Sequence, residues 1–411
     1  MKRTYLDHAA TTQPLASVID EVTEHLKYSG NASALHSAGR RARAVVEQAR
    51  ERIAQAVGCD SAEVIFTAGG TEADNLAIKG IYRKRTHINP QCRRILISSI
   101  EHHAVSESAE WLEAHEQAQL CWIPVDSHGL IDMKALKALI EEDPENTALI
   151  TVMWANNEVG TIQPIREIAE LSATYNIPFH TDAVQAFGAI PINFRQTGAN
   201  SMAISGHKMG APQGIGALIA TRTTALTPVL HGGGQERAVR SGTLDTASIA
   251  GFGVAAQEVT QHLAEEMVRL GTLRNTLIER IRHEIPNATL RGAEPESIEE
   301  LEQEGATRRL PHNVHFTFDG CEGDSLLFLL DMAGIESSTG SACNAGVPRP
   351  SHVLLAMGVD EEHARGAQRF TLGHTSTSED IDALMEALPG AYEQAHKAGL
   401  AAHVPNEHIW H

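Results

Sequence analysis

The chain has 411 residues, with 52 acidic against 33 basic side chains and a formal net charge of −19 at pH 7. Nucleic acid or an anionic membrane would call for clustered Lys and Arg, so we expect neither as a direct partner. Hydrophobic residues make up 42% and charged residues 21%, a globular balance, and the length predicts one large domain with a smaller one.

The cysteines and the N-terminal residues bear on the compartment. Five cysteines in a chain of this length form no disulfide framework and are typical of a reducing environment. The sequence has no run of eighteen apolar residues, and residues 1–8 carry two basic side chains with no apolar run behind them. We therefore expect a cytoplasmic protein without a membrane segment or a signal peptide.

Short apolar, β-branched runs alternate with helix-length stretches between residues 64 and 219. Seven such runs predict strands, at residues 64–67, 95–97, 120–125, 148–153, 178–182, 202–205 and 214–219. Their spacing predicts an α/β domain with a largely parallel seven-stranded sheet. The last run follows its predecessor closely, so we expect it to be an antiparallel partner.

The pattern changes after about residue 245. A charged amphipathic stretch at 258–285 is followed by alternating runs at 312–318 and 368–372, which are typical of half-buried strands. These features predict a smaller α+β domain. The predicted boundaries are 15–257 for the large domain and 1–14 together with 258–411 for the small one.

Polar residues after predicted strands are the first candidates for a site, because open α/β sheets bind ligands at the carboxyl ends of their strands. The first strand is followed by Gly69-Gly70-Thr71, a turn that lets backbone N–H groups approach an anion at a helix N-terminus. An ordinary turn with Thr71 as N-cap explains this segment equally well. The segment contains neither a Walker loop nor a dinucleotide fingerprint.

Two later strand ends carry charged side chains. Asp182 ends an apolar strand, where a lone carboxylate is unfavourable unless it meets a cation. Ser205, His207 and Lys208 end the next strand, although Lys208 taken alone would more often be a solvated surface residue. Together with the glycine turn, these residues match a pyridoxal-phosphate site, in which the lysine carries the aldehyde as a Schiff base and the aspartate pairs with the pyridine N–H.

Further motifs extend along nearly the whole chain. They lie at residues 5–12, 30–33, 101–105, 156–160, 231–237, 240–243 and 369–373. With these motifs the sequence resembles the IscS/NifS-type cysteine desulfurases, a group of class V, fold-type I pyridoxal-phosphate enzymes. The resemblance implies that fold, that cofactor, and an activity that takes sulfur from L-cysteine and leaves L-alanine.

The resemblance also implies roles for single residues. Lys208 would bind the cofactor aldehyde and later move the Cα proton, and Asp182 would pair with the ring nitrogen. His102 would stack on the ring and act in proton transfer, while Arg369 would clamp the substrate carboxylate. The other contacts implied are Gly70, Thr71, Asn157, Gln185, Ser205, His207 and Thr243 for the cofactor, and Asn157 and Asn31 for the substrate. Thr243 would reach the site of a neighbouring subunit, which implies a homodimer.

Cys343 distinguishes the subgroups of this family. It lies among small polar residues, which predicts an exposed loop, and residues 337–343 match the Ser-Ser/Thr-Gly-Ser-Ala-Cys pattern of the IscS/NifS group. The resemblance implies that the Cys343 thiolate takes the sulfur as a persulfide and passes it to an iron–sulfur scaffold or a tRNA-thiolation protein. The cysteines expected to be bystanders are Cys59, Cys92, Cys121 and Cys321.

Other functions stay open on the sequence. A selenocysteine lyase or a class V aminotransferase would use the same cofactor, and a non-catalytic sulfur-transfer or iron–sulfur scaffold is a third alternative, against which the Lys208–Asp182 pair argues. The sequence has no His-Glu-x-x-His and no Cys-x-x-Cys, so we expect no resident metal, and only Cys343 is a candidate transient iron–sulfur ligand. His374 stands where the family commonly has arginine and is a candidate to alter the substrate pocket.

Overall fold

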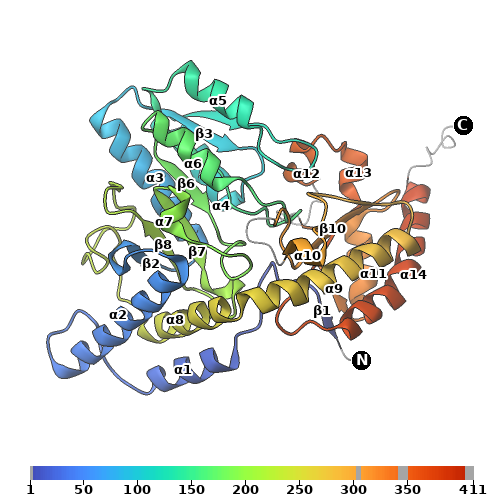
Figure 1. Cartoon of the computed structure of the whole chain (residues 1–411), viewed down its shortest axis with the longest axis horizontal. Helices are drawn as coiled ribbons and strands as arrows, with labels where there is room; N and C mark the ends of the chain where they lie inside the picture. The colour runs from blue at the N-terminus through green and yellow to red at the C-terminus, as the bar shows by residue number, and fades with distance from the viewer. Residues whose placement is uncertain (1–2, 302–306, 341–349, 403–411) are drawn as a thin grey trace, which may run out of the picture.

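The computed structural model describes residues 3–301, 307–340 and 350–402. Its largest sheet has seven strands in the order β2-β8-β7-β6-β5-β3-β4 (Figure 1). These strands are β2 Val64–Thr67, β3 Arg94–Ser98, β4 Gln119–Ile123, β5 Thr147–Thr151, β6 Phe179–Asp182, β7 Ser201–Ser205 and β8 Gly216–Ala220. Only β8 runs antiparallel to its neighbours, β2 and β7. The predicted sheet, with its antiparallel last strand, is confirmed.

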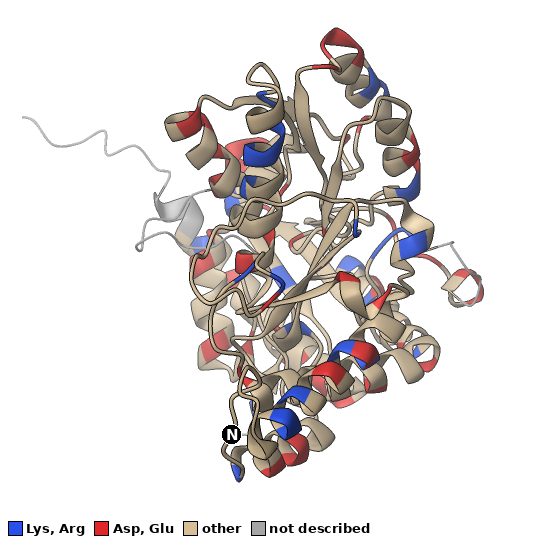
Figure 2. Ribbon diagram, turned by 90° about the vertical axis from the view of Figure 1, so that its left-hand side faces the viewer, with Lys and Arg blue, Asp and Glu red and all other residues tan. Residues whose placement is uncertain are grey.

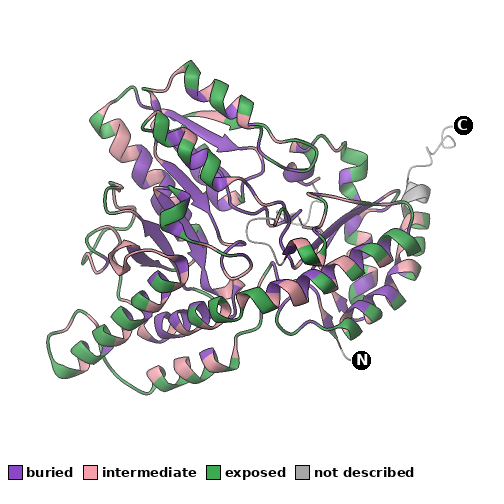
Figure 3. Ribbon diagram, viewed as in Figure 1, coloured by how far each residue is buried: buried purple, intermediate pink, exposed green. Residues whose placement is uncertain are grey.

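Helices cover both faces of this sheet, which is why most of its strands are continuous apolar runs. One face packs against α2, α5, α6 and α8, and the other packs against α3 and α4. Figure 3 shows the resulting buried layer in the middle of the domain. The helices of this part are α1 Ala16–Leu26, α2 Ser37–Val57, α3 Gly70–Ile88, α4 His103–Glu116, α5 Met133–Glu142, α6 Ile165–Thr174, α7 Phe194–Thr197 and α8 Thr246–Gln261.

A second, smaller sheet has the order β12-β10-β9 and is antiparallel. Its strands are β9 Ala288–Leu290, β10 Asn313–Phe318 and β12 Ala367–Thr371, while β1 Thr4–Tyr5 pairs with β11 Ile335–Glu336. The helices of this part are α9 Leu263–Glu284, α10 Ile298–Leu301, α11 Gly323–Met332, α12 His352–Ala356, α13 Glu361–Arg365 and α14 Ser378–Ala402. The predicted α+β character is present here. The proposed division at residue 257 lies within α8 and stays a prediction.

One expectation for this smaller sheet was wrong. Strands β10 and β12 are buried along their whole length rather than half-buried. One face carries Phe316 and Phe370 into the core formed with α9 and α14. The other face carries polar residues against the large sheet's loops, where Asn313 Nδ2 donates to the Glu158 carbonyl at 3.0 Å. Polar alternation in these strands therefore reflects an interface between the two sheets rather than a solvent-exposed face.

The surface helices carry acidic and basic residues side by side (Figure 2). Among the described residues, no helix has both the length and the apolar character that crossing a bilayer requires.

Candidate active site

A cavity at the carboxyl ends of β6 and β7 contains every predicted cofactor residue except Thr243. The chain segments that meet there are the start of α3, the loops after β3 and β5, and the ends of β6 and β7. The lining residues are Gly70, Thr71, Asp74, His102, Ala104, Met153, Asn157, Asp182, Val184, Gln185, Ser205, His207 and Lys208. The strand-end argument therefore located this cavity from sequence.

The glycine turn forms one wall of the cavity. Helix α3 begins at Gly70 with Gly69 at the N-cap position, so Thr71 lies inside the helix and is not its N-cap. A Cβ atom on Gly70 would lie 2.6 Å from Cγ2 of Val184, so a larger residue would displace the chain there. The first N–H groups of α3 have no acceptor within the helix, and together with the Thr71 hydroxyl they suit an anionic group.

Asp182 is the buried acid of the cavity. It ends β6, and its Oδ1 accepts a hydrogen bond from the Val184 N–H at 2.8 Å. Burial, followed by the nearby Asp74 carboxyl, raises the pKa of Asp182 to about 8. A cationic partner in the cavity would stabilise the ionised form, because the protein itself provides little compensation for that charge.

Lys208 lies opposite this acid in a short turn directly after β7, the strand that pairs with β6. Its Nζ donates to the carbonyl oxygens of Ala9 at 2.5 Å and Ala10 at 2.8 Å. Burial and the Arg369 charge lower the pKa of Lys208 to about 8, against the opposing effect of Asp182. About a tenth of this side chain is therefore a neutral, nucleophilic amine at pH 7, far more than for an ordinary lysine.

His102 and His207 are neutral imidazoles at the cavity. His102 precedes α4 as its N-cap and accepts from the Ala104 N–H through Nδ1 at 3.1 Å. Desolvation by the surrounding protein and the Lys208 charge lower the pKa of His102 to about 4. The same two causes lower the pKa of His207 to about 4. Neither ring therefore adds positive charge beside Lys208 at neutral pH.

Arg369 lies on β12, beside the cavity. Its Nη1 donates to the Asn157 carbonyl at 2.8 Å, and its Nη2 pairs with Asp7 Oδ1 at 2.8 Å. The small sheet thus delivers a guanidinium to the edge of the large-sheet site. Its proposed role as a carboxylate clamp stays a prediction.

Asn31 and Thr243 are not among the residues that line the cavity. Asn31 is exposed, with Oδ1 accepting from the Ser33 N–H at 2.9 Å. Thr243 is exposed on the surface of this chain. Cys343 lies outside the described residues. The roles predicted for all three stay predictions.

Two carboxylates at the site had no role in the sequence analysis. Asp74 lines the cavity, and its Oδ1 lies 3.2 Å from Nε2 of His180, whose Nδ1 lies 2.9 Å from the Ser201 hydroxyl. Its position four residues after Gly70, on the same side of α3, was a usable signal. Asp7 belongs to the N-terminal motif, but its contact with Arg369 joins residues 362 positions apart, which no local pattern reveals.

Three of the four cysteines expected to be bystanders have a raised pKa, which makes their thiols poor nucleophiles. Burial raises the pKa of Cys59 and of Cys321 to about 12 and also raises that of Cys92. Thiols in such surroundings stay protonated and react slowly.

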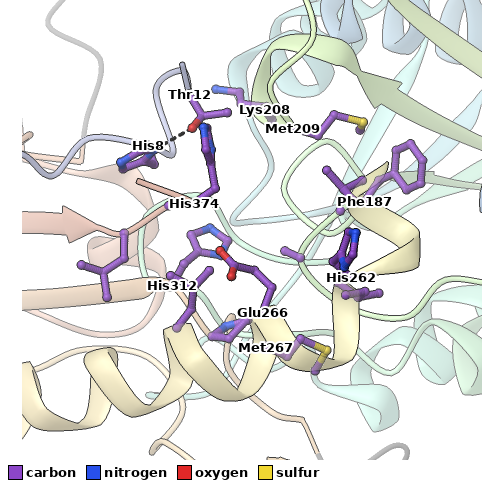
Figure 4. A pocket seen from close by; sticks show the side chains of 18 of the residues that line it. His8, Thr12, Phe187, Lys208, Met209, His262, Glu266, Met267, His312 and His374 are labelled. Atoms are coloured by element: carbon purple, nitrogen blue, oxygen red, sulfur yellow. Dashed lines mark hydrogen bonds between the residues drawn. The ribbon is translucent and has the colours of Figure 1, made fainter. Parts of the chain in front are cut away.

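A second cavity adjoins the first and is drawn in Figure 4. Lys208 and Gln185 line both cavities. His374 lines only this second one, with its ring centroid 6.3 Å from that of His8. The predicted influence of His374 on the substrate pocket stays a prediction. Among the described residues, no three His, Cys, Asp or Glu side chains are grouped so that they could hold a metal ion.

A mainly parallel sheet with a lysine and an aspartate at neighbouring strand ends places the chain in the fold-type I class. Residues 4–384 match the family described as Aminotransferase class-V, and the chain belongs to that family. It is 49% identical to the IscS-like cysteine desulfurase of Mycobacterium tuberculosis, over 97% of this chain and 98% of that protein. The predicted fold class and the IscS/NifS resemblance are confirmed.

Solved structures agree. A NifS-like protein from Rickettsia africae superposes with a TM-score of 0.83 at 34% identity, covering 95% of this chain and 99% of that one. A structure described as SspA in complex with cysteine gives a TM-score of 0.74 at 32% identity, covering 90% of this chain and 98% of that one.

Proposed function

We propose that this protein is a cysteine desulfurase that takes sulfur from L-cysteine, releases L-alanine and holds the sulfur as a persulfide on Cys343. The observation that carries the proposal is the placement of Lys208 and Asp182 in one cavity, with both pKa values close to 8. The likeness to IscS-like cysteine desulfurases supports the choice of L-cysteine as substrate.

The residues at the cavity fit pyridoxal 5′-phosphate. Gly70, Thr71, Ser205 and His207 offer a glycine turn, two hydroxyls and an imidazole to a phosphate group. At the other side, the buried Asp182 carboxyl suits a protonated pyridine nitrogen. Asn157 and Gln185 also line the cavity and would contact the ring oxygen, and Thr243 of a second subunit would complete the phosphate site.

The cofactor, when bound, supplies an electron sink for the carbon that loses its proton. The protein would orient the substrate through Arg369, which binds its carboxylate, with Asn157 and Asn31 as further contacts. Lys208 Nζ would accept and return the Cα proton, a task that suits an amine whose pKa is about 8. His102, neutral and at the cavity edge, would hold or donate a proton at its ring nitrogen.

The sulfur step requires a second thiol. The Cys343 thiolate would attack the sulfur of bound L-cysteine, so that the C–S bond breaks, an S–S bond forms and the carbon skeleton leaves as L-alanine. One sulfur atom moves and no outside oxidant is consumed. A thiol then releases the sulfur as sulfide or accepts it as a new persulfide.

The test is to incubate the cofactor-loaded protein with L-cysteine and a thiol reductant and to measure L-alanine and sulfide. We expect both in equal amounts, with Cys343→Ala greatly reduced and Cys321→Ala, the matched control at a buried thiol, unchanged. Alanine formation by Cys343→Ala at the wild-type rate would contradict the persulfide role. Faster turnover of L-selenocysteine with no need for Cys343 would favour a selenocysteine lyase, and formation of a keto acid from the amino donor would favour an aminotransferase.

The setting of this activity follows from the same resemblance. We propose a homodimer in the cytoplasm, in which Thr243 of each subunit completes the other's site, and a sulfur acceptor that is an iron–sulfur scaffold or a tRNA-thiolation protein. The net charge of −19 argues that any link to tRNA runs through such a protein rather than through direct binding. Isolation of the persulfidated protein with the thiol that receives its sulfur would identify the acceptor.

A further inference from the structure

The guanidinium proposed to bind the substrate carboxylate already faces a carboxylate of its own chain. Arg369 Nη2 lies 2.8 Å from Asp7 Oδ1, and the two side chains are 6% and 21% exposed. The third donor position, Nε, is buried and has no hydrogen-bond partner among the described residues. Within the described part of the chain, Arg369 thus has one charged partner, Asp7, and one unpaired donor, Nε.

Asp7 is held in this place by its backbone. It forms a β-bridge with Thr371, two residues along β12 from Arg369. The Tyr5 hydroxyl donates to the Asp7 carbonyl at 3.0 Å, and the Ala9 N–H donates to the Thr371 hydroxyl at 2.9 Å. Because the backbones of both residues are fixed on neighbouring, β-bridged segments, the pair separates by side-chain rotation, and the more exposed Asp7 side chain is the one with room to turn toward solvent.

A second carboxylate at Arg369 would meet Asp7 at close range. Two carboxylates sharing one partly buried guanidinium repel each other, and the site would then carry a net negative charge. The incoming carboxylate must therefore displace the Asp7 side chain toward solvent or bind with reduced affinity. Ligands without a carboxylate make no such demand.

We propose that Asp7 determines specificity at this site, by competing with the α-carboxylate of the amino-acid substrate for Arg369. The inference rests on the proposed function for the identity of the amino acid, but it concerns binding rather than sulfur transfer. Asp7 would thereby keep the affinity for amino acids moderate. Between turnovers, it would hold the Arg369 guanidinium in position and compensate its charge.

The test compares two ligands that differ only in the carboxylate. L-Alanine and ethylamine are titrated into the cofactor-loaded wild type and Asp7→Asn, and binding is followed by the visible absorbance of the cofactor. We expect Asp7→Asn to bind L-alanine about fivefold more tightly, the range for a partly exposed ion pair, with ethylamine binding little changed. The ratio of the two dissociation constants cancels any effect of Asp7 on the charge of Lys208.

The matched control is Glu336→Gln. Glu336 lies near the same N-terminal strand, but its carboxylate pairs with Arg3 at 3.2 Å, so the ligand ratio should not change. Asp7→Ser provides a second removal of the charge should Asp7→Asn be unstable. An unchanged or lower preference for L-alanine in both Asp7 variants would overturn the inference. Failure of the wild type to release sulfide from L-cysteine would contradict the proposed function alone, since these titrations require no turnover.

Discussion

The two cavities that share Lys208 and Gln185 differ in chemistry. In the cavity at the strand ends, burial raises the pKa of Asp182 and lowers that of Lys208, so that both values are about 8. In the second cavity, burial lowers the pKa of His8 to about 4, and the ring lies 2.6 Å from the Thr12 hydroxyl as an ordinary neutral group (Figure 4). The two cavities have similar volumes, about 210 Å³ each. The cavity at the strand ends is distinguished by a buried acid and a buried base whose charged forms need a ligand.

The largest expected effect on activity comes from replacing Lys208, the proposed base. Lys208→Ala should lower L-alanine formation about 10⁴-fold, because no other amine can take its place in proton transfer. The absorbance of the bound cofactor should change as well. Lys79→Ala is the matched control, since burial also lowers the pKa of Lys79, but this ammonium lies over the Trp111 ring at 4.7 Å, away from the cavity. Equal losses in the two variants would contradict the assignment.

Replacement of Asp182, the buried acid of the first cavity, should lower the activity and raise the stability of the protein. Asp182→Asn should lower activity about 10³-fold, the order expected when a buried charge loses its partner. Asp74→Asn, which keeps a polar group at 3.2 Å from His180 in the same cavity, should cost far less. A similar loss in both variants would show that Asp182 has no special part.

The stability of the cofactor-free protein supplies the second measurement. The pKa of Asp182 is about 8 in the folded chain against 3.8 as its ordinary value, so between these limits the folded state keeps a proton that the unfolded state releases. This group therefore lowers stability as pH rises, by about 1.4 kcal/mol per pH unit. In thermal melting, the melting temperature of Asp182→Asn relative to the wild type should rise from pH 4 to pH 8. A difference in melting temperature that stays constant over this range would contradict the raised pKa of Asp182.

The next effect concerns the histidine at the edge of the first cavity. His102→Gln should lower L-alanine formation about 10²-fold, as expected for loss of a proton-transfer group. His103→Gln is a close control, because this neighbouring ring is 42% exposed and lies 3.7 Å from Glu107 on the surface of α4. If His102→Gln and His103→Gln form L-alanine at the same rate, His102 has no part in proton transfer.

The cavity at the strand ends could be predicted because Asp182 and Lys208 follow strands that the sequence pattern itself predicts. Asp182 and Lys208 end consecutive apolar runs, and the rule that parallel strands end at one edge brings them together. Asp74 was not identified, although its position four residues after Gly70, at the start of α3, was a usable signal. The burial of β10 and the contact of Asp7 with Arg369 depend on tertiary partners far away in the chain, and no local pattern encodes those.

The smallest expected effect tests the second cavity. His374 replaces the arginine common in the family, and the sequence alone suggested an influence on the substrate pocket. Its ring lines the second cavity together with Lys208, and burial lowers its pKa, so that it adds little charge at neutral pH. His374→Ala should therefore change KM and kcat for L-cysteine by less than about twofold, within the range of ordinary surface changes.

His374→Arg should have more effect than His374→Ala, because it would place a permanent cation near Lys208 and lower the pKa of that amine further. Steady-state kinetics of the two variants over pH 6 to 9 separate these effects, and a large change in His374→Ala would mean that both cavities take part in the reaction.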